Sequence, residues 1–155
     1  RIKKVIAAVH AGWRGSALGI SAKVVRLMQY SYNSQPQDLL AAIGPSIGPC
    51  CYEVDLSTAD AFRRQKNAED FLFPGKRKDR WMLDLVEVNR RQILDCGIPN
   101  TNIQAADVCT VCRQDAFFSH RGSGGITGRQ INFMMIKGDP PCRVLTVDDD
   151  LRRLH

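Results

Sequence analysis

Apolar and polar residues follow two kinds of pattern near the start of this chain, and each predicts a different element. A nearly continuous apolar run from Ile2 to His10, rich in β-branched side chains, predicts a buried strand. Gly12, Gly15 and Ser16 then interrupt the apolar run and predict a tight turn. Apolar residues recur at helical spacing from Ile20 to about Tyr32, which predicts an amphipathic helix. The chain therefore opens as a strand, a glycine turn and a helix.

Other short apolar runs predict further strands. These runs lie at 39–43, 81–83, 103–106 and 129–136. The loop at 44–49 follows the first of them and contains two prolines and two glycines, which exclude regular structure. The sequence therefore places short strands on both sides of its helices.

Two more helices follow from apolar spacing and from residues typical of helix ends. Residues 56–66 form a short helix in this interpretation, with Asp55 or Ser57 as its N-cap. Residues 85–94 place their apolar side chains near one face, and Cys96-Gly97 ends that helix. We interpret the polar, basic stretch between these two helices as a connection.

Length and composition fit one folded domain. The chain has 155 residues, of which 44% are apolar and 25% charged, which is typical of globular proteins. The mixed order of elements predicts an α+β domain of mixed sheets flanked by helices. We expect this domain to span 1–137 and to lack an N-terminal portion, because the chain opens directly on a core strand. Residues 138–155 carry few apolar side chains and are predicted to form a tail.

Charge and cysteine content narrow the expected partners and location. A net charge of +6 suits small anions such as phosphate, but Lys76, Arg77, Lys78 and Arg80 are typical of a solvated loop. We therefore expect no nucleic acid partner. No apolar run approaches the roughly 20 residues that cross a bilayer, so no membrane partner is expected. Six cysteines without a secretory signal predict a reducing, cytoplasmic location.

The segment from His10 to Gly15 concentrates side chains that can carry chemistry. His10 can bind a metal or move a proton, and Arg14 can hold an oxyanion with its guanidinium fork. Glycines on both sides of Trp13 and Arg14 let a ligand approach the backbone closely. The alternative is a histidine satisfied at the end of a strand beside a structural tryptophan.

Cys109 and Cys112 have the spacing of half a zinc site. The sequence shows no second Cys-x-x-Cys pair and no His-x-His pair to complete it. A redox pair of the thioredoxin kind is disfavoured because no convincing apolar helix follows Cys112. We therefore expect two buried structural thiols here.

A glycine-rich turn at 122–125 is the last candidate. It lacks the lysine of a P-loop and the pattern of a dinucleotide-binding loop, so we interpret it as a flexible hairpin turn. Ser119, His120, Arg121 and Arg129 flank the turn and could contact a phosphate or a sugar.

Several motifs in this order resemble one family. They are His10-Ala11-Gly12-Trp13-Arg14-Gly15, Ile43-Gly44-Pro45-Ser46-Ile47-Gly48, Cys51-Tyr52-Glu53-Val54, Cys109-Thr110, Phe117-Phe118-Ser119-His120-Arg121 and Gly128-Arg129. Together they are similar to the bacterial YfiH-type proteins, which are called multicopper polyphenol oxidases, laccase-domain proteins or purine nucleoside phosphorylases. The resemblance runs from about Val5 to Ile136.

The resemblance implies a YfiH-like single domain that holds one metal, zinc or copper, through a histidine, a cysteine and a second histidine. The second histidine corresponds to His10, and the other two ligands are expected upstream of Arg1. Cys50, Cys51, Cys109 and Cys112 are not expected to substitute for them.

The resemblance also implies an activity, namely phosphorolysis of adenosine and inosine, with adenosine deamination in some members. On this basis we expect His10 and Arg14 to be catalytic. Trp13, Ser119, His120 and Arg129 are expected to bind a nucleoside and phosphate. The active site should lie where the loops around 10, 44–53 and 109–129 converge.

Two alternatives remain open. One is a copper-dependent polyphenol oxidase, although a single His/Cys site is far from the several coppers of laccase chemistry. The other is a non-catalytic binding protein that retains the fold. The sequence also departs from the family after Arg121, where Gly122–Gly125 replaces a second arginine and an aspartate. The oligomeric state is left open.

Overall fold

The computed structural model describes residues 2–136. Its α-helices are α1 (Trp13–Ala17), α2 (Ile20–Tyr32), α3 (Leu56–Arg63) and α4 (Leu85–Asp95). Its 3₁₀ helices are η1 (Pro36–Asp38), η2 (Ala68–Asp70) and η3 (Asn100–Asn102). Its strands are β1 (Ala41–Ile43), β2 (Glu53–Asp55), β3 (Leu72–Pro74), β4 (Arg80–Leu83) and β5 (Ile103–Ala105). The predicted α+β class is confirmed.

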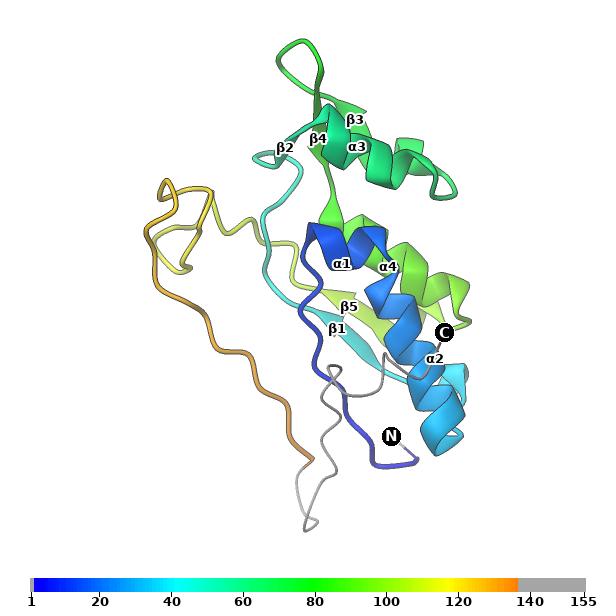
Figure 1. Ribbon diagram of the computed structural model, residues 1–155. Coiled ribbons are helices and arrows are strands. Elements are labelled where there is room, and N and C mark those ends of the chain that lie inside the picture. The colour runs from blue at the N-terminus through cyan, green and yellow to red at the C-terminus, as the bar shows by residue number, and fades with distance from the viewer. Residues whose placement is uncertain (1, 137–155) are drawn as a thin grey trace.

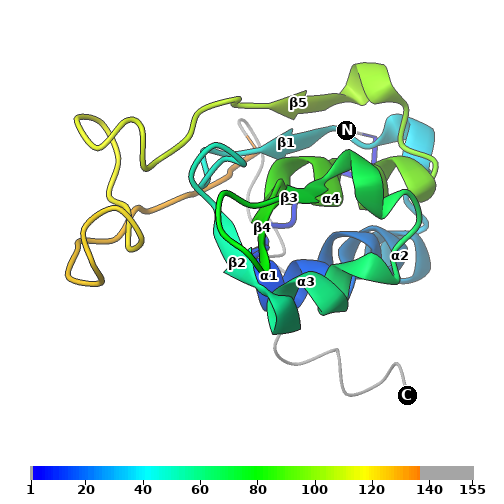
Figure 2. The ribbon, with the colours of Figure 1, turned by 90° about the horizontal axis from the view of Figure 1, so that it is seen from above.

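These strands form one parallel and one antiparallel sheet. β1 pairs with β5 in parallel, with Ala41 opposite Ile103, and the two strands run side by side in Figure 2. β4 lies between β2 and β3 and is antiparallel to both. Figure 1 shows the antiparallel sheet and α3 at one end of the molecule, with α1, α2 and α4 beside the parallel pair.

Two apolar cores correspond to these two parts. The first contains Tyr52, Val54, Ala59, Phe62, Phe71, Leu83, Leu85 and Val88. The second contains Val24, Val25, Met28, Leu39, Ile93 and Ile98. Helix α4 contributes Leu85 and Val88 to the first core and Ile93 to the second, so this helix joins the two.

A buried polar network links α1, α2 and α4. The Asn89 side-chain amide donates to Ser16 Oγ at 2.8 Å and to the Leu85 carbonyl at 2.7 Å. Ser21 Oγ donates to Asn89 Oδ1 at 2.7 Å, and Ser16 Oγ donates to the Ala11 carbonyl at 3.1 Å. This network holds the start of α1, and with it the predicted His10–Gly15 segment, against α4.

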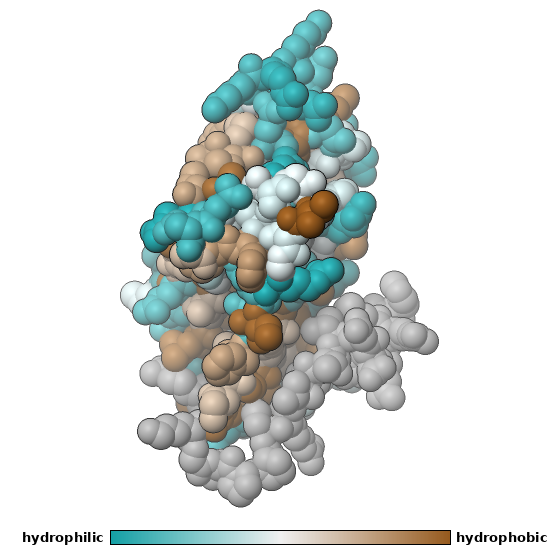
Figure 3. Space-filling view, turned by 90° about the vertical axis from the view of Figure 1, so that its left-hand side faces the viewer, coloured by the Kyte–Doolittle hydropathy of each residue, from teal (hydrophilic) through white to brown (hydrophobic). Residues whose placement is uncertain are grey.

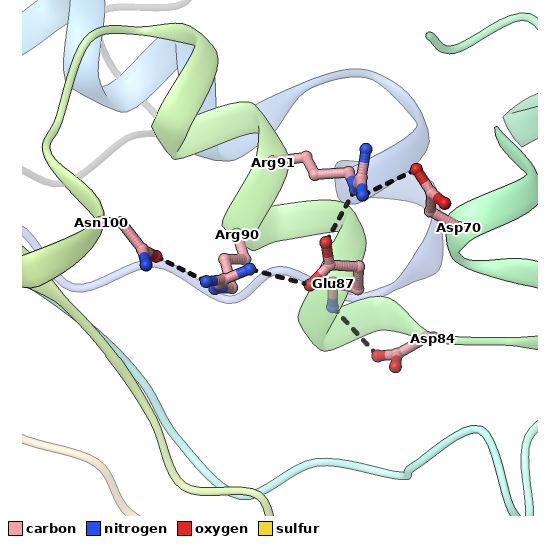
Figure 4. A network of polar contacts seen from close by, with 6 residues as sticks. All are labelled: Asp70, Asp84, Glu87, Arg90, Arg91 and Asn100. Carbon is pink, nitrogen blue, oxygen red and sulfur yellow. Dashed lines mark hydrogen bonds and ion pairs between the residues drawn. The ribbon is translucent and has the colours of Figure 1, made fainter. Parts of the chain in front are cut away.

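The other face of α4 carries a charged network, shown in Figure 4. The Asp84 carboxylate accepts from the Glu87 backbone N–H at 3.0 Å and caps the helix. Glu87 in turn pairs with Arg90 at 3.4 Å and Arg91 at 2.7 Å. Arg91 also pairs with Asp70 at 2.7 Å, so the network ties α4 to η2.

Most predicted elements are confirmed with shifted ends. The predicted helices correspond to α2, α3 and α4, and Asp55 rather than Ser57 caps α3, accepting from the Thr58 N–H at 2.9 Å. The strands predicted at 39–43, 81–83 and 103–106 correspond to β1, β4 and β5. The predicted glycine turn contains α1, and the predicted connection contains β3. No helix between residues 2 and 136 is long and apolar enough to cross a membrane.

Two predicted strands are wrong. Residues 2–10 make only a single bridge at Ile6, and no ladder in the described part includes 129–136. Ile131 and Phe133 are 88% and 84% exposed. Figure 3 shows apolar side chains on the side of the molecule along which this segment runs. Apolar pattern indicates a preference for strand, but a strand forms only when a partner takes its hydrogen bonds. The predicted tail at 138–155 lies outside the described residues.

Candidate functional site

Four separate segments of the chain line one polar hollow beside β2. Its volume is about 300 Å³, and it is open to solvent on one side. The lining residues are Trp13, Tyr52, Glu53, Val54, Asp55, Thr58, Arg77, Arg80 and Arg121. They come from α1, from β2 with the residues just before it and the start of α3, from β4 with the loop before it, and from the segment after β5. The hollow thus takes residues from parts of the predicted segments, namely Trp13, Tyr52, Glu53 and Arg121, and also from Thr58, Arg77 and Arg80, which lie outside them.

Guanidinium groups lie on both aromatic rings of this hollow. The Arg14 guanidinium carbon is 4.6 Å from the Trp13 ring centroid, and that of Arg121 is 5.2 Å from the Tyr52 ring centroid. Arg121 also donates to the Glu53 carbonyl at 2.8 Å. Such stacking holds a guanidinium in place while leaving part of its fork free to bind an anion.

The carboxylates of the hollow already have partners. Hydrogen bonding to Arg77 lowers the pKa of the Glu53 carboxyl, and the N–H of Thr58 lowers the pKa of Asp55. Arg80 has no ion-pair partner in the part of the chain that the structure describes. The charge of Arg80 also lowers the pKa of Glu53 and Asp55, but its guanidinium group makes no ion pair in that part and can still donate to an anion.

Burial and charge act in opposite directions on Tyr52. Burial raises the pKa of its hydroxyl, while the charges of Arg121 and Arg14 lower it. The net pKa lies above the ordinary value, so Tyr52 stays neutral near pH 7 and can donate a hydrogen bond.

His10 is exposed and lies directly against Gly12. A Cβ atom at Gly12 would come within 3.0 Å of His10 Nε2, so the glycine permits this approach. Between residues 2 and 136, no group of three potential metal ligands includes His10. The described residues therefore do not form the His/Cys/His site that the resemblance implies, and His10 as a ligand stays a prediction.

Three other predicted residues do not line the hollow. Ser119 is buried, and its Oγ accepts from the Gly122 N–H at 3.2 Å, which stabilises the turn. His120 and Arg129 are exposed. Their roles as substrate contacts stay predictions, whereas their neighbour Arg121 does reach the hollow.

Sequence reasoning also assigned Arg77 and Arg80 to a solvated loop. Both are exposed, yet the turn before β4 brings them to the rim of the hollow. Only the register of β4 against β2, with Asp55 opposite Arg80, reveals this placement.

Four cysteine thiols gather outside the hollow, in the loops that follow β1 and β5. Cys50, Cys51, Cys109 and Cys112, here called the thiol cluster, have sulfur atoms that all lie within 4.8 Å of one another. The prediction of two buried thiols is wrong, because Cys112 is exposed and Cys109 is half-buried, and adjacent Cys50 and Cys51 complete the group without a second Cys-x-x-Cys pair. Such a cluster can hold one metal ion.

Ionisation differs within the thiol cluster. Burial and hydrogen bonds with Cys112 and its other neighbours raise the pKa of Cys51 to about 12. Burial opposes ionisation of Cys109 as well, but the N–H groups of Gly48, Cys112 and Val111 lower its pKa to about 6. Cys109 is therefore more readily ionised than Cys51.

Comparison with known proteins gives close relatives. Purine nucleoside phosphorylase YlmD from Geobacillus stearothermophilus is 42% identical over 135 residues, which cover 84% of this chain and 48% of the relative. The human protein named purine nucleoside phosphorylase LACC1 is 34% identical over 140 residues, which cover 88% of this chain and 32% of the relative. The chain spans about half the length of the first of these and less of the second.

Solved structures agree with these relatives. The crystal structure of YlmD from Geobacillus stearothermophilus matches with a TM-score of 0.72 at 42% identity, covering 77% of this chain and 45% of that one. A Bacillus licheniformis protein called YfiH matches with a TM-score of 0.72 at 39% identity, covering 76% and 44%. A family model described as multi-copper polyphenol oxidoreductase laccase matches residues 1–137. The resemblance found in the motifs is thus confirmed, and the chain belongs to this laccase-domain family.

Proposed function

We propose that this chain forms part of a purine nucleoside phosphorylase, and that the hollow beside β2 binds phosphate and the nucleoside. The observation that carries the proposal is a polar hollow lined by Arg80 and by Arg121, whose guanidinium stacks on Tyr52. Relatives named purine nucleoside phosphorylase support the substrate class.

The proposed reaction transfers a ribosyl group from a purine to phosphate. A phosphate oxygen forms a bond to C1′ of the ribose, and the bond from C1′ to the purine nitrogen breaks. The electron pair of that bond leaves with the purine, which takes up a proton. The enzyme must therefore hold a dianion next to a ribosyl group that becomes positively charged.

Arg121 and Arg80 are suited to the phosphate. Both line the hollow, and a guanidinium fork binds phosphate oxygens in a bidentate manner. Arg121 is already oriented by the Glu53 carbonyl and by Tyr52, so little side-chain entropy is lost when the anion binds. The neutral Tyr52 hydroxyl is a donor available to a ribose or phosphate oxygen.

His10 and Arg14 remain the proposed catalytic residues; neither lines the hollow, but Arg14 stacks on Trp13, which does. His10 remains the proposed metal ligand, zinc or copper, and Ser119, His120 and Arg129 remain proposed substrate contacts. A metal bound there would supply Lewis acidity. None of the steps above is assigned to it, because the described residues offer one ligand.

The test uses the intact, metal-loaded protein. Incubation with inosine and phosphate should release hypoxanthine and ribose 1-phosphate, and release should depend on phosphate. Arg121→Ala should lower kcat/KM roughly 10- to 100-fold, since a hydrogen bond to a charged group contributes about 1.5–3 kcal/mol.

Arg63→Ala is the matched control. Arg63 stacks on Trp81 at the same 4.6 Å distance that separates Arg14 from Trp13, but it does not line the hollow. Its replacement should leave kcat/KM within about twofold of wild type. Absence of phosphate-dependent base release would refute the function, and an equal loss in both variants would refute the role of Arg121.

Polyphenol oxidation is a second candidate, favoured by the description of the family model. If the protein is a polyphenol oxidase, oxidation of a phenolic dye must rise with bound copper and vanish when zinc replaces it. Equal oxidation by a His10→Ala variant would assign the signal to copper bound elsewhere. We propose a cytoplasmic location for either activity, because the cysteines among the described residues form no disulfide.

A further inference from the structure

The thiol cluster lies where two parallel strands end. The loop with Cys50 and Cys51 follows β1, and the loop with Cys109 and Cys112 follows β5. Beyond the strands, Ser46 bridges to Cys109, and the Thr110 N–H donates to the Ser46 carbonyl at 2.9 Å. The pairing of β1 with β5 therefore brings the two cysteine pairs together although they are far apart in sequence.

Distances within the thiol cluster match those of one tetrahedral ion. With a zinc–sulfur bond of about 2.3 Å, tetrahedral geometry separates neighbouring sulfur atoms by about 3.8 Å. Cys112 Sγ lies 3.7 Å from Cys50 Sγ and 3.5 Å from Cys51 Sγ. A disulfide needs about 2.05 Å, so these thiols are spaced for a shared ion rather than for a bond.

The backbone around Cys109 also suits a metal-bound sulfur. The N–H groups of Val111 and Cys112, two and three residues further on, point at the Cys109 sulfur together with that of Gly48. Such donors stabilise negative charge on a coordinating thiolate. A Cβ atom at Gly48 would come within 3.2 Å of Cys109 Cβ, so a glycine there allows the two loops to approach.

We propose that the thiol cluster binds one zinc ion through four thiolates, and that this ion ties the loop before β2 to the segment after β5. Four sulfur ligands in a tetrahedron are typical of structural zinc sites. This site is separate from the metal site implied for His10, which belongs to no such cluster in the described residues.

The zinc would fix the positions of two segments that line the hollow. Cys51 directly precedes Tyr52, and the Cys109–Cys112 turn leads into the segment that carries Arg121. Arg121 stacks on Tyr52 and donates to Glu53, so both partners of that contact are attached to the tied loops. The ion is therefore structural, and its ligands do not contact the hollow.

The first experiment measures cobalt and zinc binding by the intact protein, with Cys142 replaced by Ser in every sample. Co²⁺ should give the intense thiolate charge-transfer and tetrahedral d–d bands of a four-sulfur site. Cys109→Ser should lower zinc affinity at this site roughly 100- to 1,000-fold, because one ligand of four contributes about a quarter of the binding free energy. Cys96→Ser is the matched control, because Cys96 is half-buried and outside the cluster, and it should leave affinity unchanged.

His10→Ala separates the two metal sites. The four-sulfur cobalt spectrum should persist in this variant, because His10 is not part of the thiol cluster. Loss of that spectrum on replacing His10, or its persistence in Cys109→Ser, would overturn the proposal.

A second measurement uses the wild-type protein, so it does not depend on whether the cysteine variants fold. Alkylation of the wild-type protein, followed residue by residue by mass spectrometry, should slow at all four cluster thiols when one equivalent of zinc is added. Cys96 serves as the internal reference and should react at the same rate with and without zinc. Zinc that leaves the alkylation rates of the cluster thiols unchanged would overturn the site. So would disulfides between pairs of cluster cysteines that form under mildly reducing conditions even when zinc is present.

Discussion

Replacing Asn89 by alanine tests how the His10–Gly15 segment is held. Asn89 is 4% exposed and takes part in three hydrogen bonds, with Ser16, Ser21 and the Leu85 carbonyl. Each contributes about 1 kcal/mol net, so Asn89→Ala should lower the free energy of unfolding by about 3 kcal/mol. For a domain of this size the melting temperature should fall by roughly 6–12 °C.

Urea denaturation followed by far-UV circular dichroism gives the free energy, and Asn100→Ala is the matched control. Asn100 is exposed and accepts one hydrogen bond from Arg90, at 2.5 Å, so its replacement should change stability by about 0.5 kcal/mol or less. Because Ser16 anchors α1, Asn89→Ala should also reduce phosphorolysis under conditions where the variant is fully folded. A variant whose free energy of unfolding lies within about 1 kcal/mol of the wild-type value would refute this role of Asn89.

Three further changes have defined outcomes. Phe62→Ala removes a fully buried ring of the first core and should cost about 3–5 kcal/mol in thermal unfolding; a loss below about 1 kcal/mol would contradict its place in the core. Asp84→Ala removes the cap that binds the Glu87 N–H and should cost about 0.5–2 kcal/mol, whereas Asp84→Asn, which keeps an acceptor, should recover most of it. Arg121→Ala should raise the pKa of Tyr52 further, shifting tyrosinate absorbance to higher pH; since the raised pKa favours the neutral form in the folded state, stability should fall as pH rises above the ordinary tyrosine value. A tyrosinate titration unchanged by the substitution would place Arg121 away from the ring.

Helices could be predicted because the determining interactions are local. Helix α4 shows its apolar spacing, its Asp84 cap and its stop at Gly97, which has φ of 88°, within fifteen consecutive residues or so. Strands β2 and β3 have three residues each, too few for an alternating pattern. Pro74 ends β3 at the edge of the sheet, where its missing N–H costs no ladder bond.

The candidate site was predictable only in part, because its remaining contacts are not local. Trp13, Arg14 and Arg121 belong to motifs that the sequence displays, and two of them line the hollow. The thiol cluster was missed because a search by spacing finds only pairs close in sequence, whereas Cys50 and Cys112 are 62 residues apart and meet through the β1–β5 pairing. A pair of adjacent cysteines was the available signal.

The parallel pairing of β1 with β5 also dictates an order of folding during synthesis. The first core, from Tyr52 to Val88, is nearly contiguous in sequence and can assemble as soon as that stretch has left the ribosome. The second core cannot, because the apolar face of α2 packs on Ile93 and Ile98 and on Ile103 of β5. Until these later residues emerge, the apolar face of α2 has only part of its cover, from Leu39 and the residues before it and near β1, so we expect α2 to pack fully only after the first core has formed.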